Sequence, residues 1–181
     1  MKAHLVLLVL TGIFSFYTIV VFLPDSARDI PELKTTVAWG PSEHEKELNC
    51  LALNIYFEAR SDSFAGKIAV SDVVLNRVES DKYPNTVCEV VYQGPTGLTH
   101  KGEVMPIRHK CQFSWYCDGK TDVPHNKVAW EYAKHVSTLV IVHRGITEGA
   151  TNYHALYVFP KWANKMQSLG VIGEHRFYKE S

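Results

Sequence analysis

The segment LNCLALNIYFEAR, residues 48–60, decides the fold because it places apolar side chains at helical spacing. Intervals of three and four residues fit one face of an α-helix, and the residues that share this face are Leu48, Leu51, Ala52, Ile55, Tyr56 and Ala59. On a helical wheel, Glu58 falls at the edge of that face, beside Leu51. The segment therefore predicts an amphipathic helix with a carboxylic acid half-buried at its side.

Two interpretations of Glu58 stay open from these residues. A helical glutamate commonly contacts water or forms an ion pair, and Arg60 is close in sequence. Alternatively, the apolar and aromatic neighbours disfavour the charged carboxylate and raise its pKa. A carboxylic acid that keeps its proton near neutral pH can act as a general acid in catalysis.

The composition indicates one globular domain. The chain has 181 residues, of which 46% are hydrophobic and 21% are charged, as is typical of a single folded domain. Nineteen basic residues balance nineteen acidic ones. Because no basic stripe accompanies the aromatic residues, nucleic acid is not an expected partner.

The N-terminal segment differs from this average. Residues 3–23 contain no Asp, Glu, Lys or Arg, and a helix of roughly 20 residues can cross a bilayer. A cleaved signal peptide is the alternative, but Asp25 before Ala27 makes a poor cleavage site. Lys2 precedes the apolar segment, so an anchor would keep the N-terminus in the cytoplasm and export the domain. If the segment is cleaved, the domain is secreted.

Three regions follow from this interpretation. Residues 1–23 are expected to form the signal anchor or signal peptide, residues 24–43, with three prolines, a tether, and residues 44–181 the folded domain. An exported domain lies in a compartment that permits disulfides.

The four cysteines are expected to form disulfides. They allow three pairings, of which we expect Cys111–Cys117 as a local link and Cys50–Cys88 as a longer one. Free buried thiols and a zinc site are the alternatives. The sequence has no Cys-x-x-Cys or His-x-x-Glu-His spacing, so we expect no metal and no other cofactor.

The rest of the chain predicts further helices. Residues 61–63 should end the first helix and cap a second over residues 64–78, which is apolar around most of its circumference and should be buried. Residues 93–110 indicate a loop or short hairpin. Asp122 and Pro124 open a helix that Arg144 and Gly145 end. The fold class is therefore helix-dominated α+β.

Six blocks of the sequence resemble the SleB/CwlJ group of cell-wall hydrolases, which includes the spore-cortex-lytic enzymes. They are NIYFEAR, GKIAVSDVVLNRV, YPNTVCEVVYQ, CQFSWYCDG, NYHA and IGEHRFY, in this order along residues 48–178. One departure is that Ser61 and Asp62 follow Arg60, where the family often has Gly and then an acid. The turn after the helix can therefore differ from the family's.

The resemblance implies a compact, lysozyme-like lytic transglycosylase domain that cleaves the MurNAc–GlcNAc backbone of peptidoglycan. It implies that Glu58 is the catalytic acid. In such an enzyme the C6 hydroxyl of MurNAc attacks its own anomeric carbon, so no second carboxylate is needed. A hydrolytic muramidase would need one, and the candidates are Asp62, Asp72, Asp118 and Glu174, none of which has the apolar setting of Glu58.

The family blocks also suggest residues for substrate binding. They are Gln112, Ser114, Trp115, Asp118, Tyr153 and His154. Aromatic rings stack on sugars, while amides, hydroxyls and acids bind sugar hydroxyls. The alternative is that Trp115 belongs to the core and that Tyr153 and His154 are structural, as we expect for Trp162, His175 and Phe177.

Other functional classes are a cysteine- or zinc-dependent peptidoglycan amidase or peptidase and a wall-binding module without catalysis. The expected partners are peptidoglycan glycan strands and, through residues 1–23, a membrane. The protein is expected to be a monomer. Its biological role would be wall remodelling or phage-type lysis.

Overall fold

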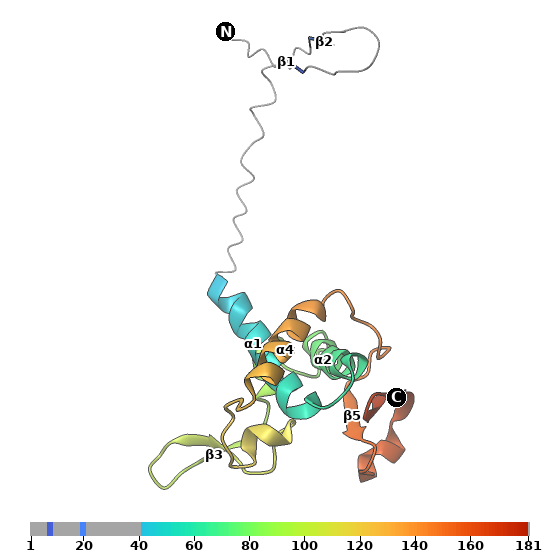
Figure 1. Cartoon of the computed structure of the whole chain (residues 1–181). Coiled ribbons are helices and arrows are strands. Elements are labelled where there is room, and N and C mark those ends of the chain that lie inside the picture. Colours follow the sequence, from blue (N-terminus) through green and yellow to red (C-terminus); the bar gives the residue numbers. More distant parts are fainter. Residues whose placement is uncertain (1–6, 9–18, 21–40, 181) are drawn as a thin grey trace. The chain divides into compact units, whose positions relative to one another are not determined.

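A computed structural model describes residues 7–8, 19–20 and 41–180 (Figure 1). The chain divides into two units, residues 1–38 and 39–181. In the first unit, β1 (Leu7–Leu8) pairs antiparallel with β2 (Ile19–Val20).

The expected membrane helix over residues 3–23 is not supported. Most of this segment and of the expected tether lies outside the described residues, and the four residues described within it form strands. Within the described part of the chain, no helix is both long and apolar enough to cross a bilayer.

Helix α1 (Pro41–Ala59) is the first element of the second unit. It begins in the expected tether, with proline at its first position, where the missing N–H costs no hydrogen bond. The expected apolar face is confirmed for Leu51, Ala52, Ile55, Tyr56 and Ala59, which are all buried.

Helix α2 (Phe64–Val78) has the bounds that the sequence predicts, and most of its residues are buried. The Ser63 hydroxyl accepts a hydrogen bond of 3.0 Å from the Gly66 N–H and so caps the helix. The loop before it, residues 60–63, is therefore short and fixes the end of α1 against the start of α2. Figure 1 shows α1, α2 and α4 gathered together.

Helix α4 (Lys127–Leu139) is shorter than predicted at both ends. Asn126, not Asp122, is its cap, since the Asn126 side chain accepts from the Ala129 N–H at 3.0 Å. At the other end, the Asp72 carboxylate accepts hydrogen bonds from the Gly145 and Thr147 backbone N–H groups. These bonds hold residues 140–149 in turns.

Between α2 and α4, the chain forms a short helix α3 (Val87–Val91), a hairpin of β3 (Thr96–Leu98) and β4 (Val104–Pro106), and a 3-10 helix η2 (Ser114–Cys117). The hairpin confirms one of the two alternatives for residues 93–110.

A three-stranded antiparallel sheet completes the domain. Its strands are β5 (Asn152–Ala155), β6 (Gln167–Ile172) and β7 (His175–Lys179), in the order β5-β7-β6, with a 3-10 helix η3 (Lys161–Lys165) before β6. Tyr153 pairs with Phe177, and Phe177 packs on α2 at Val70 and Val73. The sheet thus places Tyr153 beside the helical core.

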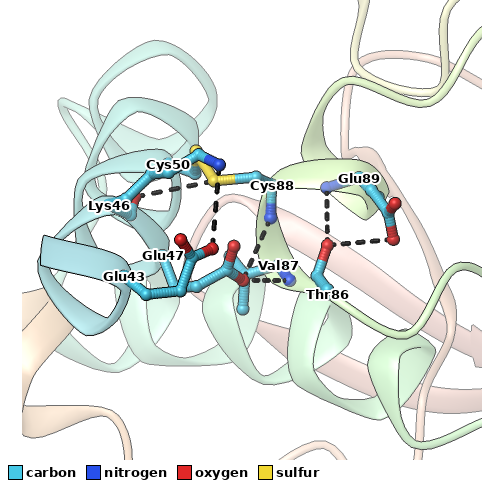
Figure 2. The surroundings of a disulfide bond; sticks show 8 residues. All are labelled: Glu43, Lys46, Glu47, Cys50, Thr86, Val87, Cys88 and Glu89. Carbon is cyan, nitrogen blue, oxygen red and sulfur yellow. Dashed lines mark hydrogen bonds and ion pairs between the residues drawn. A yellow bond between two sulfur atoms is a disulfide. The ribbon is translucent and has the colours of Figure 1, made fainter. Parts of the chain in front are cut away.

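Both expected disulfides are present. Cys50–Cys88 joins α1 to α3, and Cys111–Cys117 closes the loop that contains η2. Figure 2 shows that Glu47 lies beside the first of these links, where its carboxylate accepts from the Val87 N–H at 2.5 Å. A carboxylate at a helix N-terminus is favourable, so α1 and α3 are joined by an electrostatic contact as well as a covalent one.

Candidate active site

A cleft of about 770 Å³ opens at the C-terminal end of α1. The last turn of α1, the η2 loop, residues 118–125, strand β5 and residues 155–162 form its walls. Six of the residues predicted from sequence line it, and these are Glu58, Ser114, Trp115, Asp118, Tyr153 and His154.

Glu58 lies in the cleft as a half-buried acid. Burial raises its pKa to about 7, although a hydrogen bond from Tyr153 and the positive charge of Arg77 oppose the rise. The Tyr153 hydroxyl donates to Glu58 Oε2 at 3.3 Å. Near neutral pH, Glu58 can therefore hold a proton or release it.

This pKa predicts how stability depends on pH. The folded domain binds the Glu58 proton more tightly than the unfolded chain does, because the pKa rises from 4.5 to about 7 on folding. Stability should fall as pH rises between these two values. In Glu58→Gln this loss is absent, so the variant should be more stable than wild type by about 1–3 kcal/mol at pH 8 and little different at pH 4.

Urea unfolding at the two pH values measures this difference. The matched control is Glu103→Gln, which changes an exposed glutamate in the β3–β4 hairpin. A Glu58→Gln variant whose advantage does not grow with pH would contradict a raised pKa.

Tyr153 is held in place by the sheet. Its ring meets His175 edge-on at 5.1 Å and packs against Phe177. Burial and the neighbouring Glu58 raise the Tyr153 pKa well above 10. Tyr153 is therefore a neutral phenol at physiological pH and a hydrogen-bond donor to Glu58.

Trp115 belongs mainly to the core. It is 7% exposed, stacks on Phe57 at 4.8 Å, and donates from its indole N–H to Asn54 Oδ1 at 3.1 Å. Ser114, beside it, is exposed and faces the cleft. In the Cys111–Cys117 loop, the polar Ser114 therefore faces the cleft, next to the buried ring of Trp115.

Asp118 and Gln112 occupy different places. Asp118 lines the cleft and forms an ion pair of 3.5 Å with Lys120, and a hydrogen bond from the Lys120 N–H contributes most to its lowered pKa. Gln112 is exposed and is not part of the cleft wall. The structure therefore gives no support to Gln112 as a substrate-binding residue.

His154 supports the wall from behind. It is buried, its Nε2 lies 2.8 Å from the Tyr178 hydroxyl and its Nδ1 lies 2.9 Å from the Ala155 carbonyl. Because the Ala155 carbonyl can only accept, Nδ1 carries the proton and Nε2 accepts from Tyr178. Both ring nitrogens are occupied, as expected for a structural histidine.

The sequence interpretation missed several residues of the cleft. Tyr157, Val158 and Pro160 line it from the segment after β5, together with Trp162, which we expected to be structural. Tyr157 is 91% exposed, and Phe159 beside it is also exposed. The apolar run LYVFP directly after NYHA was the available signal, since exposed apolar residues in a row commonly mark a binding surface.

Asp62 and Asp72 are both occupied by hydrogen bonds. Asp62 accepts from the Ser63 N–H, the Glu174 N–H and His175 Nδ1 at 2.6–3.1 Å. Burial raises its pKa, but these hydrogen bonds outweigh burial and lower it. Asp72 is fully buried and accepts three hydrogen bonds from Gly145 and Thr147. Both carboxylates therefore have a structural role.

Asp122, which we expected only to begin a helix, is a carboxylate of the cleft. It is half-buried, and burial followed by repulsion from Asp118 raises its pKa. Within residues 41–180, no group of three or more His, Cys, Asp or Glu side chains is arranged to hold a metal ion. Glu58 and Asp122 are thus two carboxyl groups of the cleft whose pKa is raised.

Comparison with known proteins identifies the family of this domain. Residues 61–178 match the Cell Wall Hydrolase family, Hydrolase_2, and the match begins three residues after Glu58. The spore cortex-lytic enzyme of Bacillus cereus is 39% identical over 59 residues, which are 33% of this chain and 22% of the relative. The enzyme of the same name from Bacillus subtilis is 33% identical over 70 residues, 39% of this chain and 22% of the relative. The matched region is thus about a fifth of the length of these relatives.

Two solved structures are similar over most of the domain. The catalytic domain of the Bacillus cereus SleB protein has a TM-score of 0.56 and 26% identity, and covers 75% of this chain and 91% of the solved chain. The catalytic domain of the germination-specific lytic transglycosylase SleB from Bacillus anthracis has the same TM-score and identity, and covers 74% and 93%. With the family match over residues 61–178, these likenesses show that the chain belongs to the SleB/CwlJ family of cell wall hydrolases.

Proposed function

We propose that the protein cleaves the MurNAc–GlcNAc backbone of peptidoglycan as a lytic transglycosylase, with Glu58 as its acid and then its base. The observation that carries this proposal is the position of Glu58 in the cleft with a pKa of about 7. A group that must first donate and then accept a proton works best when its pKa is near the working pH.

The reaction follows from this one carboxyl group. Protonated Glu58 donates its proton to the glycosidic oxygen, the C1–O bond breaks, and GlcNAc leaves with a free hydroxyl. The Glu58 carboxylate then takes the proton from the MurNAc C6 hydroxyl, whose oxygen bonds to C1 and gives a 1,6-anhydro product. Glu58 ends protonated, so the enzyme is restored without another reactant.

The setting of Glu58 supports this route. The hydrogen bond from Tyr153 holds one carboxyl oxygen of Glu58, which lines the cleft. Asp62 and Asp72 are saturated by hydrogen bonds and are poor candidates for a second catalytic carboxylate.

Hydrolysis is the second candidate, and Asp122 is the observation that favours it. Asp122 lines the same cleft as Glu58 and also has a raised pKa. A carboxylate across a cleft from a general acid can activate water or form a covalent glycosyl intermediate.

Mass spectrometry of the products from purified peptidoglycan separates the two mechanisms. Fragments that end in 1,6-anhydro-MurNAc support the lytic transglycosylase. Reducing ends, lost in an Asp122→Asn variant, would replace it with a two-carboxylate muramidase. Cleaved peptides with intact glycan strands would overturn both.

Tyr157 is expected to hold the glycan strand. A phenol ring that is almost fully exposed at the cleft can stack on a sugar ring. Tyr157→Ala should raise KM for soluble glycan fragments about tenfold, with kcat little changed, because the ring binds substrate and transition state alike. Steady-state kinetics measure KM and kcat separately.

The matched control for this prediction is Tyr132→Ala, an exposed tyrosine of α4 that lies outside the cleft wall. Tyr157→Phe should keep most of the affinity, since it keeps the ring. An unchanged KM in Tyr157→Ala would remove Tyr157 from the substrate site.

The proposed substrate implies where the protein acts. Peptidoglycan lies outside the cytoplasmic membrane, and the two disulfides suit the same side. We infer an extracytoplasmic enzyme of wall remodelling or phage-type lysis that works as a monomer. Anchoring through residues 3–23 stays a prediction from their composition.

A further inference from the structure

Arg77 is a buried cation without a carboxylate partner. It is 4% exposed, and its Nε donates to the Thr151 carbonyl at 2.7 Å. Its guanidinium lies over the rings of Tyr83 and Phe113 at 5.1 and 5.3 Å. Among residues 41–180, no carboxylate forms an ion pair with Arg77, and its Nη1 has no hydrogen-bond acceptor. Such a buried charge is costly unless something compensates it.

Asn54 provides a second donor without an acceptor. It is fully buried and lies one helical turn before Glu58 on α1, so the two side chains share a face. Its Oδ1 accepts from Trp115, but its Nδ2 has no acceptor within the described part of the chain. Buried N–H groups without acceptors are rare, and each one needs an explanation.

Both donors are more deeply buried than Tyr153 and Glu58, which are only partly buried. Thr151, which Arg77 holds, comes just before the strand that carries Tyr153. The positive charge of Arg77 acts on both Glu58 and Tyr153. A neutral Glu58 leaves these groups uncompensated, whereas a negatively charged one compensates them.

We propose that Arg77, assisted by Asn54, is the buried counter-charge that stabilises the Glu58 carboxylate after Glu58 has given up its proton. Arg77 is a positioning residue that acts through the partly buried Tyr153 and makes no contact with the glycan. This inference rests on the proposed function for its substrate, and it deepens that function by explaining how one carboxyl group can alternate between acid and base.

The reaction needs such a counter-charge. When the glycosidic oxygen takes the proton, a carboxylate forms in surroundings that disfavour charge. A fixed cation already in place stabilises that state without reorganisation, which is the way preorganised sites lower barriers. The same cation does little for the protonated ground state, so its effect appears in the rate.

Other ionisable groups also face Glu58. Tyr153 lies against it, the cleft contributes Arg60, Asp118, Lys120, Asp122, His125, His154, Tyr157 and His175, and the adjoining hollow contributes Asp62 and Glu174. Burial is the main cause of the raised Glu58 pKa, while the hydrogen bond from Tyr153 and the charge of Arg77, from α2, lower it. A change in Glu58 titration on replacing Arg77 is thus attributable to Arg77.

The test is the titration of Glu58 by carbon NMR of its carboxyl group, in the full chain. Arg77→Met and Arg77→Gln remove the charge, and the second can still donate to Thr151. Each should raise the titration midpoint by about one pH unit. In the pH profile of the cleavage rate, the decline on the alkaline side should move to higher pH by the same amount. The rate at the optimal pH should fall about tenfold to hundredfold.

The matched control is Arg144→Met, which removes the same charge from an arginine paired with Glu79. It should leave the midpoint and the rate unchanged. Folded Arg77→Met and Arg77→Gln variants in which Glu58 titrates as in wild type would overturn the proposal.

If neither Arg77→Met nor Arg77→Gln folds, the variants Arg77→Lys and Asn54→Leu test the proposal instead. The proposal then requires a midpoint near the wild-type value in Arg77→Lys and a raised one in Asn54→Leu, and an unmoved midpoint in Asn54→Leu overturns it. Failure of the lytic transglycosylase assignment would appear separately, in the chemical ends of the products.

Discussion

Glu58→Gln should abolish cleavage of peptidoglycan, with a loss in rate of at least about 10³-fold. The amide keeps the size of the side chain and can still pair with Tyr153, but it has no proton to give to the glycosidic oxygen. It also cannot take the proton of the C6 hydroxyl, so both halves of the reaction lose their catalyst. Release of soluble fragments from purified peptidoglycan, followed by mass spectrometry, measures the loss.

The matched control for this change is Glu103→Gln, which should cleave as fast as wild type. Glu58→Asp should retain only a small part of the activity, because the aspartate side chain is one methylene shorter and holds its carboxyl group farther from the glycosidic oxygen. Full cleavage by Glu58→Gln would mean that another group is the acid. Loss of cleavage with retained binding to peptidoglycan would exclude a wall-binding module without catalysis.

The double variant Cys50→Ala/Cys88→Ala should lower the free energy of unfolding by about 4 kcal/mol. The two cysteines are 38 residues apart, so the disulfide restricts a long loop of the unfolded chain. The link joins the middle of α1 to α3, whereas Glu58 lies in the last turn of α1. We therefore expect a large loss of stability with little change in kcat below the unfolding temperature.

Urea unfolding and cleavage assays of two double variants check this expectation. Cys111→Ala/Cys117→Ala opens a link between residues only 6 apart and should cost about 2 kcal/mol. That loop carries Ser114 and Trp115 of the cleft wall, so this variant should lose activity more than stability. Equal losses of stability in the two variants would show that loop length does not govern the contribution of these disulfides.

Local patterns were sufficient for the first two helices of the domain. The apolar spacing in residues 48–59 predicted which side of α1 is buried, and Ser63 predicted the start of α2. The edge position of Glu58 followed from the same spacing. These features depend on neighbours within one or two helical turns, which a sequence displays directly.

The errors at α4 have a long-range cause. The Asn126 N–H donates to the Tyr56 hydroxyl at 3.0 Å, which ties the start of the helix to α1. Asp72, more than 70 residues earlier in the chain, holds the turns that follow the helix. Neither partner can be recognised from residues 122–145 alone.

The sheet was missed for a related reason. Its middle strand, β7, has buried residues at His175, Phe177 and Tyr178. The strand also contains His175, Arg176 and Lys179, so its sequence lacks the alternation of apolar and polar residues that identifies a strand.

The site was predictable only in part. Tyr153 and His154 were candidates through the family blocks, and the structure gives them different roles: one contacts Glu58 and the other supports the wall. Gln112 was a candidate on the same basis and lies outside the cleft. The roles of Tyr157, Asp122 and Arg77 could be recognised only in the tertiary structure, because each role depends on residues that are distant in sequence.

The strand order β5-β7-β6 has a consequence for the timing of activity during synthesis. Strands β5 and β6 pair only with β7, which leaves the ribosome after both of them. Until then, the strand that carries Tyr153 has no hydrogen-bonded neighbour, and Glu58 lacks the phenol that orients it. The hydrogen bond between Tyr153 and Glu58 can therefore form in its final geometry only after residues 175–179 have joined the sheet.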